Sequence, residues 1–168
     1  MLHQATGTIY AACSTLAGRL AWMPALHSLN ASARSRDDYV AVHDPRTATT
    51  TRLALAGLAD ARGLSVHGMD VVPSSANPAE LFVYLVNHRP RTDAGAGSTD
   101  PSVEVFRTTL GARVLQHVRT YADAAVVRSP NDVVGAPDGQ SFWFTNDGSH
   151  LRGFAVRPRV PRSPFRTA

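Results

Sequence analysis

The sequence predicts an all-β fold. Short runs of β-branched, aromatic and other apolar residues alternate with turn residues along most of the chain. No stretch sustains a helical period, and the best candidate for a helical turn, Leu20–Leu29, is interrupted by Pro24. One plan of polar residue, strand, turn and second strand also recurs after about 60 residues, as in repeat architectures.

Ten strands are expected from this pattern. In chain order they are Thr8–Ala12, Tyr39–Val42, Arg52–Leu55, Leu64–Val66, Met69–Val72, Leu81–Val86, Val103–Arg107, Val114–Arg119, Asp132–Gly135 and Ser141–Phe144. Asp44-Pro45-Arg46 and Thr109-Leu110-Gly111 are typical hairpin turns.

Three segments lack the strand pattern. Leu16–Asp38 is predicted to be an irregular insertion, and Arg89–Pro101, rich in Gly, Ser, Asp and Pro, an exposed loop. Arg152–Ala168 carries three prolines and five arginines, which predicts a disordered tail. The expected organisation is therefore one β domain over residues 1–150 and a tail over 151–168.

The repeat is clearest in two copies, and a fainter copy opens the chain at His3–Gly7 and Thr8–Ala12. Each clear copy begins with polar residues before an apolar strand, turns, and ends its second strand on another polar pair. The first copy contains His67, the turn Pro73–Pro78 and Asn87-His88, and the second contains Asn131-Asp132, the turn Ala136–Gly139 and Asn146-Asp147.

Units of about four strands at this spacing favour a β-propeller over a sandwich or a barrel. The expected strands make about two and a half blades, whereas a propeller needs at least about four to close. The sequence therefore predicts a partial β-propeller of about two and a half to three blades.

Charge and hydropathy exclude some classes of protein. The formal charge is +4, but five of the 17 arginines follow Asp147 and none of the 13 acids does, so the expected domain offers no basic face for nucleic acid. No apolar run is long enough for a membrane span, and the first residues show no signal-peptide pattern.

The repeated polar positions are the candidate site. In a propeller, equivalent positions of the inner strands meet around one axis, so His67 is expected near Asn131 and Asp132. Oxygen donors of this kind suit calcium, and an imidazole beside the ion could act as a general base on water. His88 and Asp147 could supply a second imidazole and an orienting carboxylate. Each residue also has a simpler interpretation, as a surface histidine, a turn asparagine or a capping carboxylate.

At these residues the sequence resembles the paraoxonase/arylesterase family, particularly its fungal members. The matching motifs, in the same order and spacing over about Leu2–Asp147, are H-G-M-D-V-V at His67–Val72, L-F-V-Y-L-V-N-H at Leu81–His88, V-E-V-F at Val103–Phe106, P-N-D-V-V at Pro130–Val134 and F-T-N-D at Phe144–Asp147.

The resemblance implies a six-bladed propeller with calcium ions in its central tunnel, and hydrolysis of lactones, aryl esters and organophosphate triesters. It implies that Asn131 ligates the catalytic calcium, and that Asp132 and the backbone carbonyl of Met69 ligate a structural one. His67 would activate water, His88 would shuttle the proton, and Asp147 would orient a histidine. The family is often secreted or membrane-associated; the compartment and the oligomeric state of this chain stay open.

The family pattern also contains ligands that this chain lacks. A Glu-Asp pair is expected just before Met1, and further Asn and Asp ligands after Asp147, where the pattern gives way to the tail. We therefore expect the chain as it stands to be inactive. Two alternatives remain: a non-catalytic propeller fragment that pairs through exposed strand edges, and a gluconolactonase-like or strictosidine-synthase-like propeller.

Overall fold

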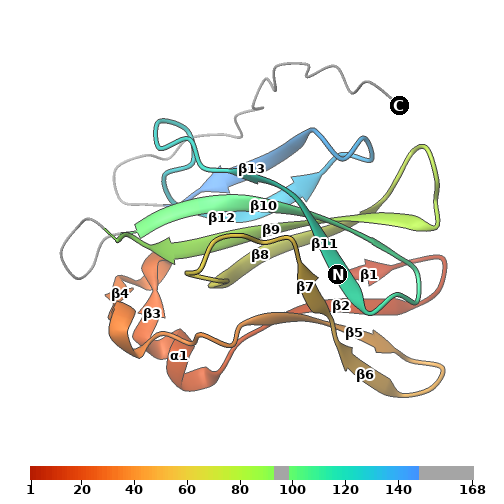
Figure 1. Ribbon diagram of the computed structural model, residues 1–168, viewed down its shortest axis with the longest axis horizontal. Helices are drawn as coiled ribbons and strands as arrows, with labels where there is room; N and C mark the ends of the chain where they lie inside the picture. Colours follow the sequence, from red (N-terminus) through yellow and green to blue (C-terminus); the bar gives the residue numbers. More distant parts are fainter. Residues whose placement is uncertain (93–98, 148–168) are drawn as a thin grey trace.

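The computed structural model describes residues 1–92 and 99–147, and this part of the chain is predominantly β (Figure 1). The strands are β1 (Leu2–His3), β2 (Thr8–Cys13), β3 (Trp22–Met23), β4 (Ser28–Leu29), β5 (Tyr39–Asp44), β6 (Thr49–Arg52), β7 (Ala54–Ala56), β8 (Val66–Pro73), β9 (Glu80–Pro90), β10 (Thr99–Thr109), β11 (Val114–Tyr121), β12 (Pro130–Gly135) and β13 (Phe142–Asn146). The helical elements are α1 (Leu16–Ala21), η1 (Pro24–Leu26) and η2 (Ala31–Ala33). The predicted tail, 151–168, lies outside the described residues.

The strands form several sheets, and none of those in the described ranges closes on itself. Their strand orders are β1-β2-β5-β6, β7-β11-β10-β9-β8, β12-β13 and β3-β4. All pairs are antiparallel except β7, which runs parallel to β11. In Figure 1 the five-stranded sheet lies between the four-stranded sheet and the β12–β13 hairpin, and β8 contacts both β2 and β12.

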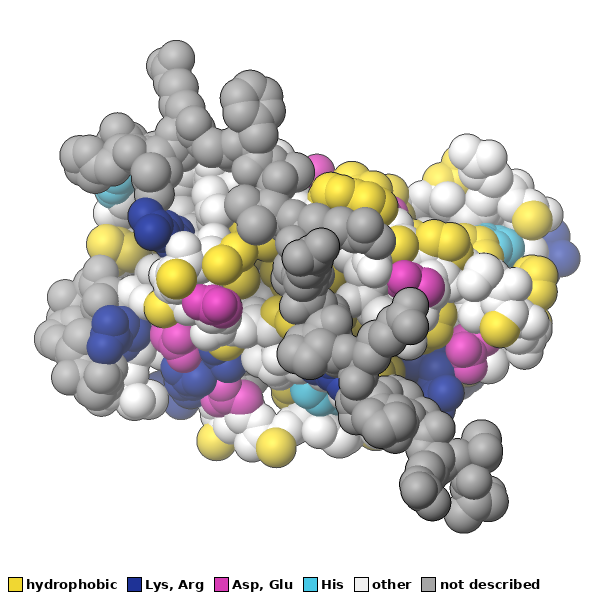
Figure 2. Space-filling view, turned by 90° about the horizontal axis from the view of Figure 1, so that it is seen from above, with side chains coloured by type: hydrophobic (Ala, Val, Ile, Leu, Met, Phe, Trp, Pro, Cys, Tyr) yellow, Lys and Arg dark blue, Asp and Glu magenta, His cyan; other side chains and the backbone are white. Residues whose placement is uncertain are grey.

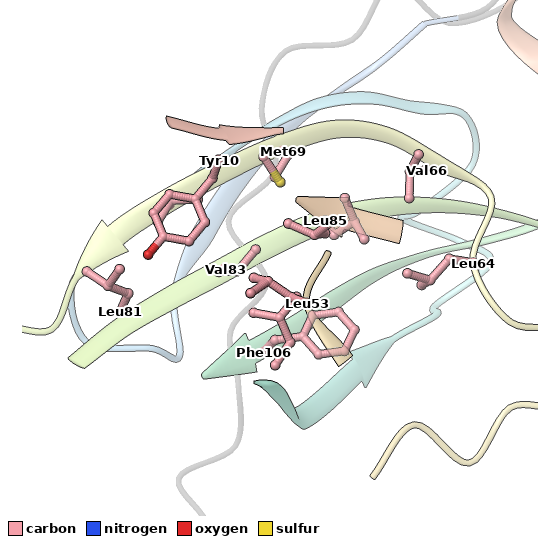
Figure 3. Close-up of a cluster of buried hydrophobic side chains, with 12 residues drawn as sticks. Tyr10, Leu53, Leu64, Val66, Met69, Leu81, Val83, Leu85 and Phe106 are labelled. Atoms are coloured by element: carbon pink, nitrogen blue, oxygen red, sulfur yellow. The ribbon is translucent and has the colours of Figure 1, made fainter. Parts of the chain in front are cut away.

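The core consists of two apolar layers, one on each side of the five-stranded sheet. Val83 and Leu85 of β9 face the four-stranded sheet, where Tyr10 and Leu53 join them (Figure 3). The alternate residues of β9, with Tyr84 among them, face the β12–β13 hairpin. Because both faces of β9 are buried, its sequence is a continuous apolar run and not an alternating one.

The predicted strand Arg52–Leu55 is wrong as a single element. β6 ends at Arg52 and β7 begins at Ala54, and the two strands belong to different sheets. Leu53 between them is only 2% exposed, and its N–H donates to the Val40 carbonyl at 2.9 Å. One continuous stretch of chain therefore supplies strands to two sheets and a core residue between them.

The predicted loop Arg89–Pro101 is wrong at both ends, because β9 continues to Pro90 and β10 begins at Thr99. Arg89 and Asp100 are paired across the two strands. Arg89 is buried, with its guanidinium 3.0 Å from Asp60 and 3.1 Å from Asp100, and Arg62 bonds the same two carboxylates. Ion pairs take the place of apolar packing here, so no apolar alternation marks these strands. Residues 93–98 lie outside the described ranges.

The insertion Leu16–Asp38 contains more regular structure than its sequence predicts. The Thr15 hydroxyl accepts the Gly18 N–H at 3.1 Å and caps α1, which ends before Pro24. β3 and β4 then form a small hairpin around η1. Local capping and a short turn suffice for these elements, and six helical residues are too few to show a period.

Charged side chains of both signs are mixed on one face of the molecule. Figure 2 shows arginine side chains lying among aspartate and glutamate side chains over the described part of one face. The prediction that the chain does not bind nucleic acid stays a prediction. No helix in the described ranges is long and apolar enough to cross a membrane.

Candidate functional site

The two predicted polar positions both lie in β-bulges. On β8, Val66 pairs with Asn87 and Met69 with Leu85, so His67-Gly68 oppose a single residue of β9. On β12, Pro130 pairs with Asn146 and Val133 with Phe144, which places Asn131-Asp132 in an equivalent bulge. A bulge turns side chains away from the regular alternation of a strand and often lies beside a functional site.

The structure brings these two bulges into contact. The Nε2 of His67 lies 2.7 Å from the Oδ1 of Asn131, which makes a hydrogen bond between residues 64 positions apart. A Cβ on Gly68 would lie 2.4 Å from the Asn131 backbone oxygen and 2.7 Å from an Asp132 carboxylate oxygen. Only glycine allows this approach, so Gly68 is part of the reason that the two polar residues meet.

This hydrogen bond defines the chemistry open to His67. An amide oxygen can only accept, so Nε2 of the neutral imidazole carries the proton and its lone pair lies on Nδ1. His67 is half-buried. A base on Nδ1 is therefore compatible with the geometry, and Asn131 fixes the orientation of the ring.

His88 lies beside His67 and is almost fully buried. The ring centroids are 5.1 Å apart, with the planes at 80°. His88 is 3% exposed, and neither ring nitrogen makes a hydrogen bond of normal geometry. Burial, and next the nearby His67, lower the pKa of His88 from 6.5 to about 4, although the Pro130 carbonyl acts in the opposite direction. His88 is therefore neutral at neutral pH.

The side chains of the other predicted site residues do not bond His67 or Asn131 in the described contacts. The Asp132 carboxylate is exposed and accepts the Val133 N–H at 2.9 Å, as a local cap would. The Met69 side chain packs in the core, directly after the β8 bulge. Asp147 is exposed; its backbone N–H donates to the Ser129 carbonyl at 2.7 Å. Among the described contacts, its carboxylate bonds neither histidine.

The insertion covers the start of β8 and the end of β9. The Trp22 indole N–H donates to the His88 carbonyl at 2.7 Å, and the Arg19 guanidinium donates to the Val66 carbonyl. Asp38 accepts the Val66 N–H at 3.0 Å. A cavity of about 10 Å³ remains beneath this cover, with both histidines in its lining. That volume admits one water molecule and no ester.

A metal shell is incomplete in the described part of the chain. Within residues 1–92 and 99–147, no three His, Cys, Asp or Glu side chains gather in a way that could hold a metal ion. The candidate oxygens of Asn131, Asp132 and the Met69 carbonyl are of the type that a hard cation prefers, but calcium takes about six to eight of them.

Sequence reasoning recorded Asn87 and Asn146 only as members of the repeated polar pairs, and it missed the two serines whose backbone they bond. Ser65 and Ser129 precede the two bulges, and Asn87 and Asn146 face the bulges from the neighbouring strands. A signal was present: both copies contain serine two residues before the site residue and asparagine before the terminal polar residue.

Comparison with models of protein families and with curated proteins finds no match to this chain.

Proposed function

We propose that the described sheets are consecutive blades of a β-propeller related to the paraoxonase/arylesterase family. The strands β8 to β11 are hydrogen-bonded in chain order, as the strands of one blade are. In this proposal β8 and β12 are inner strands of adjacent blades. Their equivalent bulges face each other, as equivalent positions around one axis would.

We infer that the site is that of a calcium-dependent hydrolase of esters and lactones, and the His67–Asn131 hydrogen bond is the observation that carries this proposal. In it, Nδ1 of His67 takes a proton from water, and His88, whose ring lies against His67, relays that proton onward to the leaving group without keeping it, since its lowered pKa disfavours the charged ring. The cavity under the insertion has room for that water. Asp147 would orient a histidine once substrate is bound.

Calcium would be held by Asn131, Asp132 and the Met69 carbonyl. When bound, such an ion polarises the scissile carbonyl or phosphoryl oxygen. These donors fit calcium in type but not in number, so the proposed proton transfers use only the two histidines. We expect the 168-residue chain to show neither calcium-dependent thermal stabilisation nor aryl-ester turnover.

The test compares this chain with a version extended to supply the remaining oxygen ligands. In the extended protein, calcium should raise the melting temperature and lactone hydrolysis should appear. His67→Gln should lower turnover by at least about 100-fold, the lower range for a lost general base, with little change in calcium affinity. The exposed His27, replaced by Asn, is the matched control. Undiminished turnover in His67→Gln would remove His67 from the mechanism.

A second candidate function, pairing through strand edges, is favoured by the β12–β13 hairpin, which in the described ranges is a sheet of only two strands and so leaves each strand one unpaired edge. Val134 and Trp143 are register partners on its outer face and are 58% and 40% exposed. A partner strand or sheet could cover this pair. Sedimentation of the purified chain tests the idea: a single defined oligomer that Trp143→Ser returns to monomer would support it, and a monomer at all concentrations would contradict it.

A further inference from the structure

Two asparagine side chains hold the segments that lead into the two bulges, and they do so in the same way. Asn87 accepts the Ser65 N–H at 2.8 Å, and Asn146 accepts the Ser129 N–H at 3.0 Å. Neither side chain merely faces solvent, since Asn87 is fully buried and Asn146 half-buried.

The other half of each amide holds the chain further upstream. The Asn87 Nδ2 donates to the Gly63 carbonyl at 3.3 Å, and the Asn146 Nδ2 donates to the Val126 carbonyl at 2.9 Å. The side-chain amide of each asparagine therefore accepts a backbone N–H and donates to a backbone carbonyl of the segment before the bulge. The backbone of a neighbouring strand would make the same two kinds of bond. The segments lie directly before Val66 and Pro130, the first residues of β8 and β12 that have a register partner.

The residue after each asparagine completes the arrangement. The His88 N–H donates to the Ser65 carbonyl at 2.9 Å, and the Asp147 N–H donates to the Ser129 carbonyl at 2.7 Å. Both serine peptides are thus fixed through their N–H and their C=O, two residues before His67 and Asn131. The backbone at this point decides where each bulge begins and where its side chain is aimed.

We propose that Asn87 and Asn146 are positioning residues: each fixes the backbone that leads into one bulge, so that His67 and Asn131 meet at hydrogen-bond distance. This inference rests on the proposed function only in so far as His67 and Asn131 are taken as the functional site. The hydrogen bonds are described by the structure whatever reaction the site performs.

The two asparagines differ in how they are themselves supported. The Asn87 Nδ2 also donates to the Glu104 carboxylate at 3.2 Å, and Glu104 is fully buried. Ser102, His117 and Thr120 bond the same carboxylate. This carboxylate accepts only, so it holds the amide with Nδ2 toward it and Oδ1 toward Ser65. A substitution of Asn87 would disturb this buried network, whereas Asn146 can be replaced with less risk to folding.

The experiment therefore uses Asn146 and reads the site directly, without measuring hydrolysis. Exchange of the His67 Nε2–H with solvent is followed by nitrogen-edited NMR in the 168-residue chain. Asn146→Ala should raise that exchange rate by about two- to tenfold, the range expected for one lost hydrogen bond. Asn146→Asp keeps the acceptor for Ser129 but puts an oxygen in place of the Nδ2 donor to Val126, so it should restore slow exchange only in part.

The matched control is Asn77→Ala, which removes an asparagine whose Oδ1 accepts a backbone N–H in the turn before β9, away from the bulges. It should leave His67 exchange unchanged. If Asn146→Ala is folded and exchanges His67 Nε2–H at the wild-type rate, the proposal is overturned. If that variant does not fold, exchange of the Ser129 N–H in the wild-type chain decides. If the Ser129 N–H is protected as strongly as the hydrogen-bonded amides of β12, the positioning role of Asn146 is supported. If it exchanges rapidly, that role is overturned. An absence of esterase activity would affect neither reading.

Discussion

Replacing His88 by phenylalanine should remove most of the acid sensitivity of the fold between pH 4 and pH 6.5. The His88 ring is buried, makes no hydrogen bond of normal geometry, and has a pKa lowered from 6.5 to about 4. In that interval the unfolded chain binds a proton at this residue and the folded chain does not. The free energy of unfolding therefore falls as the pH drops below 6.5, and His88 has no further effect above it.

The size of the effect follows from the shift. A difference of about 2.5 pH units at about 1.4 kcal/mol each gives a penalty of about 3 kcal/mol that is nearly fully developed at pH 4. Phenylalanine has a somewhat larger ring, but it does not titrate and leaves no unpaired ring nitrogen. At pH 7 His88→Phe should consequently be at least as stable as the wild-type chain, apart from small packing differences.

Urea unfolding at pH 4, 5, 6 and 7 measures this difference. Asp60 also titrates anomalously, because Arg62 holds its pKa well below the usual 3.8, but that contribution is lost mainly below pH 4 and is common to both proteins. His27→Asn removes an exposed histidine in a left-handed conformation that asparagine tolerates, and should behave as wild type. Parallel stability curves for wild type and His88→Phe, within about 0.5 kcal/mol at every pH, would refute the assigned burial and charge state.

Three further substitutions test packing, the first at the site and the other two in the core. Gly68→Ala should destabilise the fold by about 1–3 kcal/mol or more and weaken the His67–Asn131 hydrogen bond, since the new Cβ would lie 2.4 Å from the Asn131 carbonyl oxygen; an unchanged melting temperature would contradict that approach. Tyr84→Phe removes a hydroxyl that donates to the Ala136 carbonyl at 2.7 Å in the core, and should cost about 1–3 kcal/mol in urea unfolding, a neutral result arguing against the bond. Leu53→Ala should cost about 2–5 kcal/mol, and a loss below about 1 kcal/mol would mean that the segment between β6 and β7 is not core.

The strand content was predictable because most strands combine β-branched residues with clear turns. The hairpin turns at Asp44-Pro45-Arg46 and Thr109-Leu110-Gly111 are confirmed, since β5 pairs with β6 and β10 with β11. What failed was the assignment of ends and of sheet membership. No local pattern shows that a chain changes sheets at Leu53, and charged residues on Arg89–Pro101 conceal strand ends that ion pairs hold.

The site could be predicted in part because its residues occupy equivalent positions in two copies of the repeat. Repeat spacing identifies equivalent backbone positions, so it led to His67 and Asn131, whose meeting requires only that two like strands lie side by side. It could not show that His88 is buried, because its cover comes from Trp22 in an insertion that belongs to no repeat. Nor could it separate His67 and Asn131, which are proposed to take part in a reaction, from the residues proposed to position them. Asn87 and Asn146 repeat as faithfully as the site residues, and only their hydrogen bonds show that they hold backbone. Equivalence between copies therefore identifies a shared location, and the partners of each atom must decide what a residue does there.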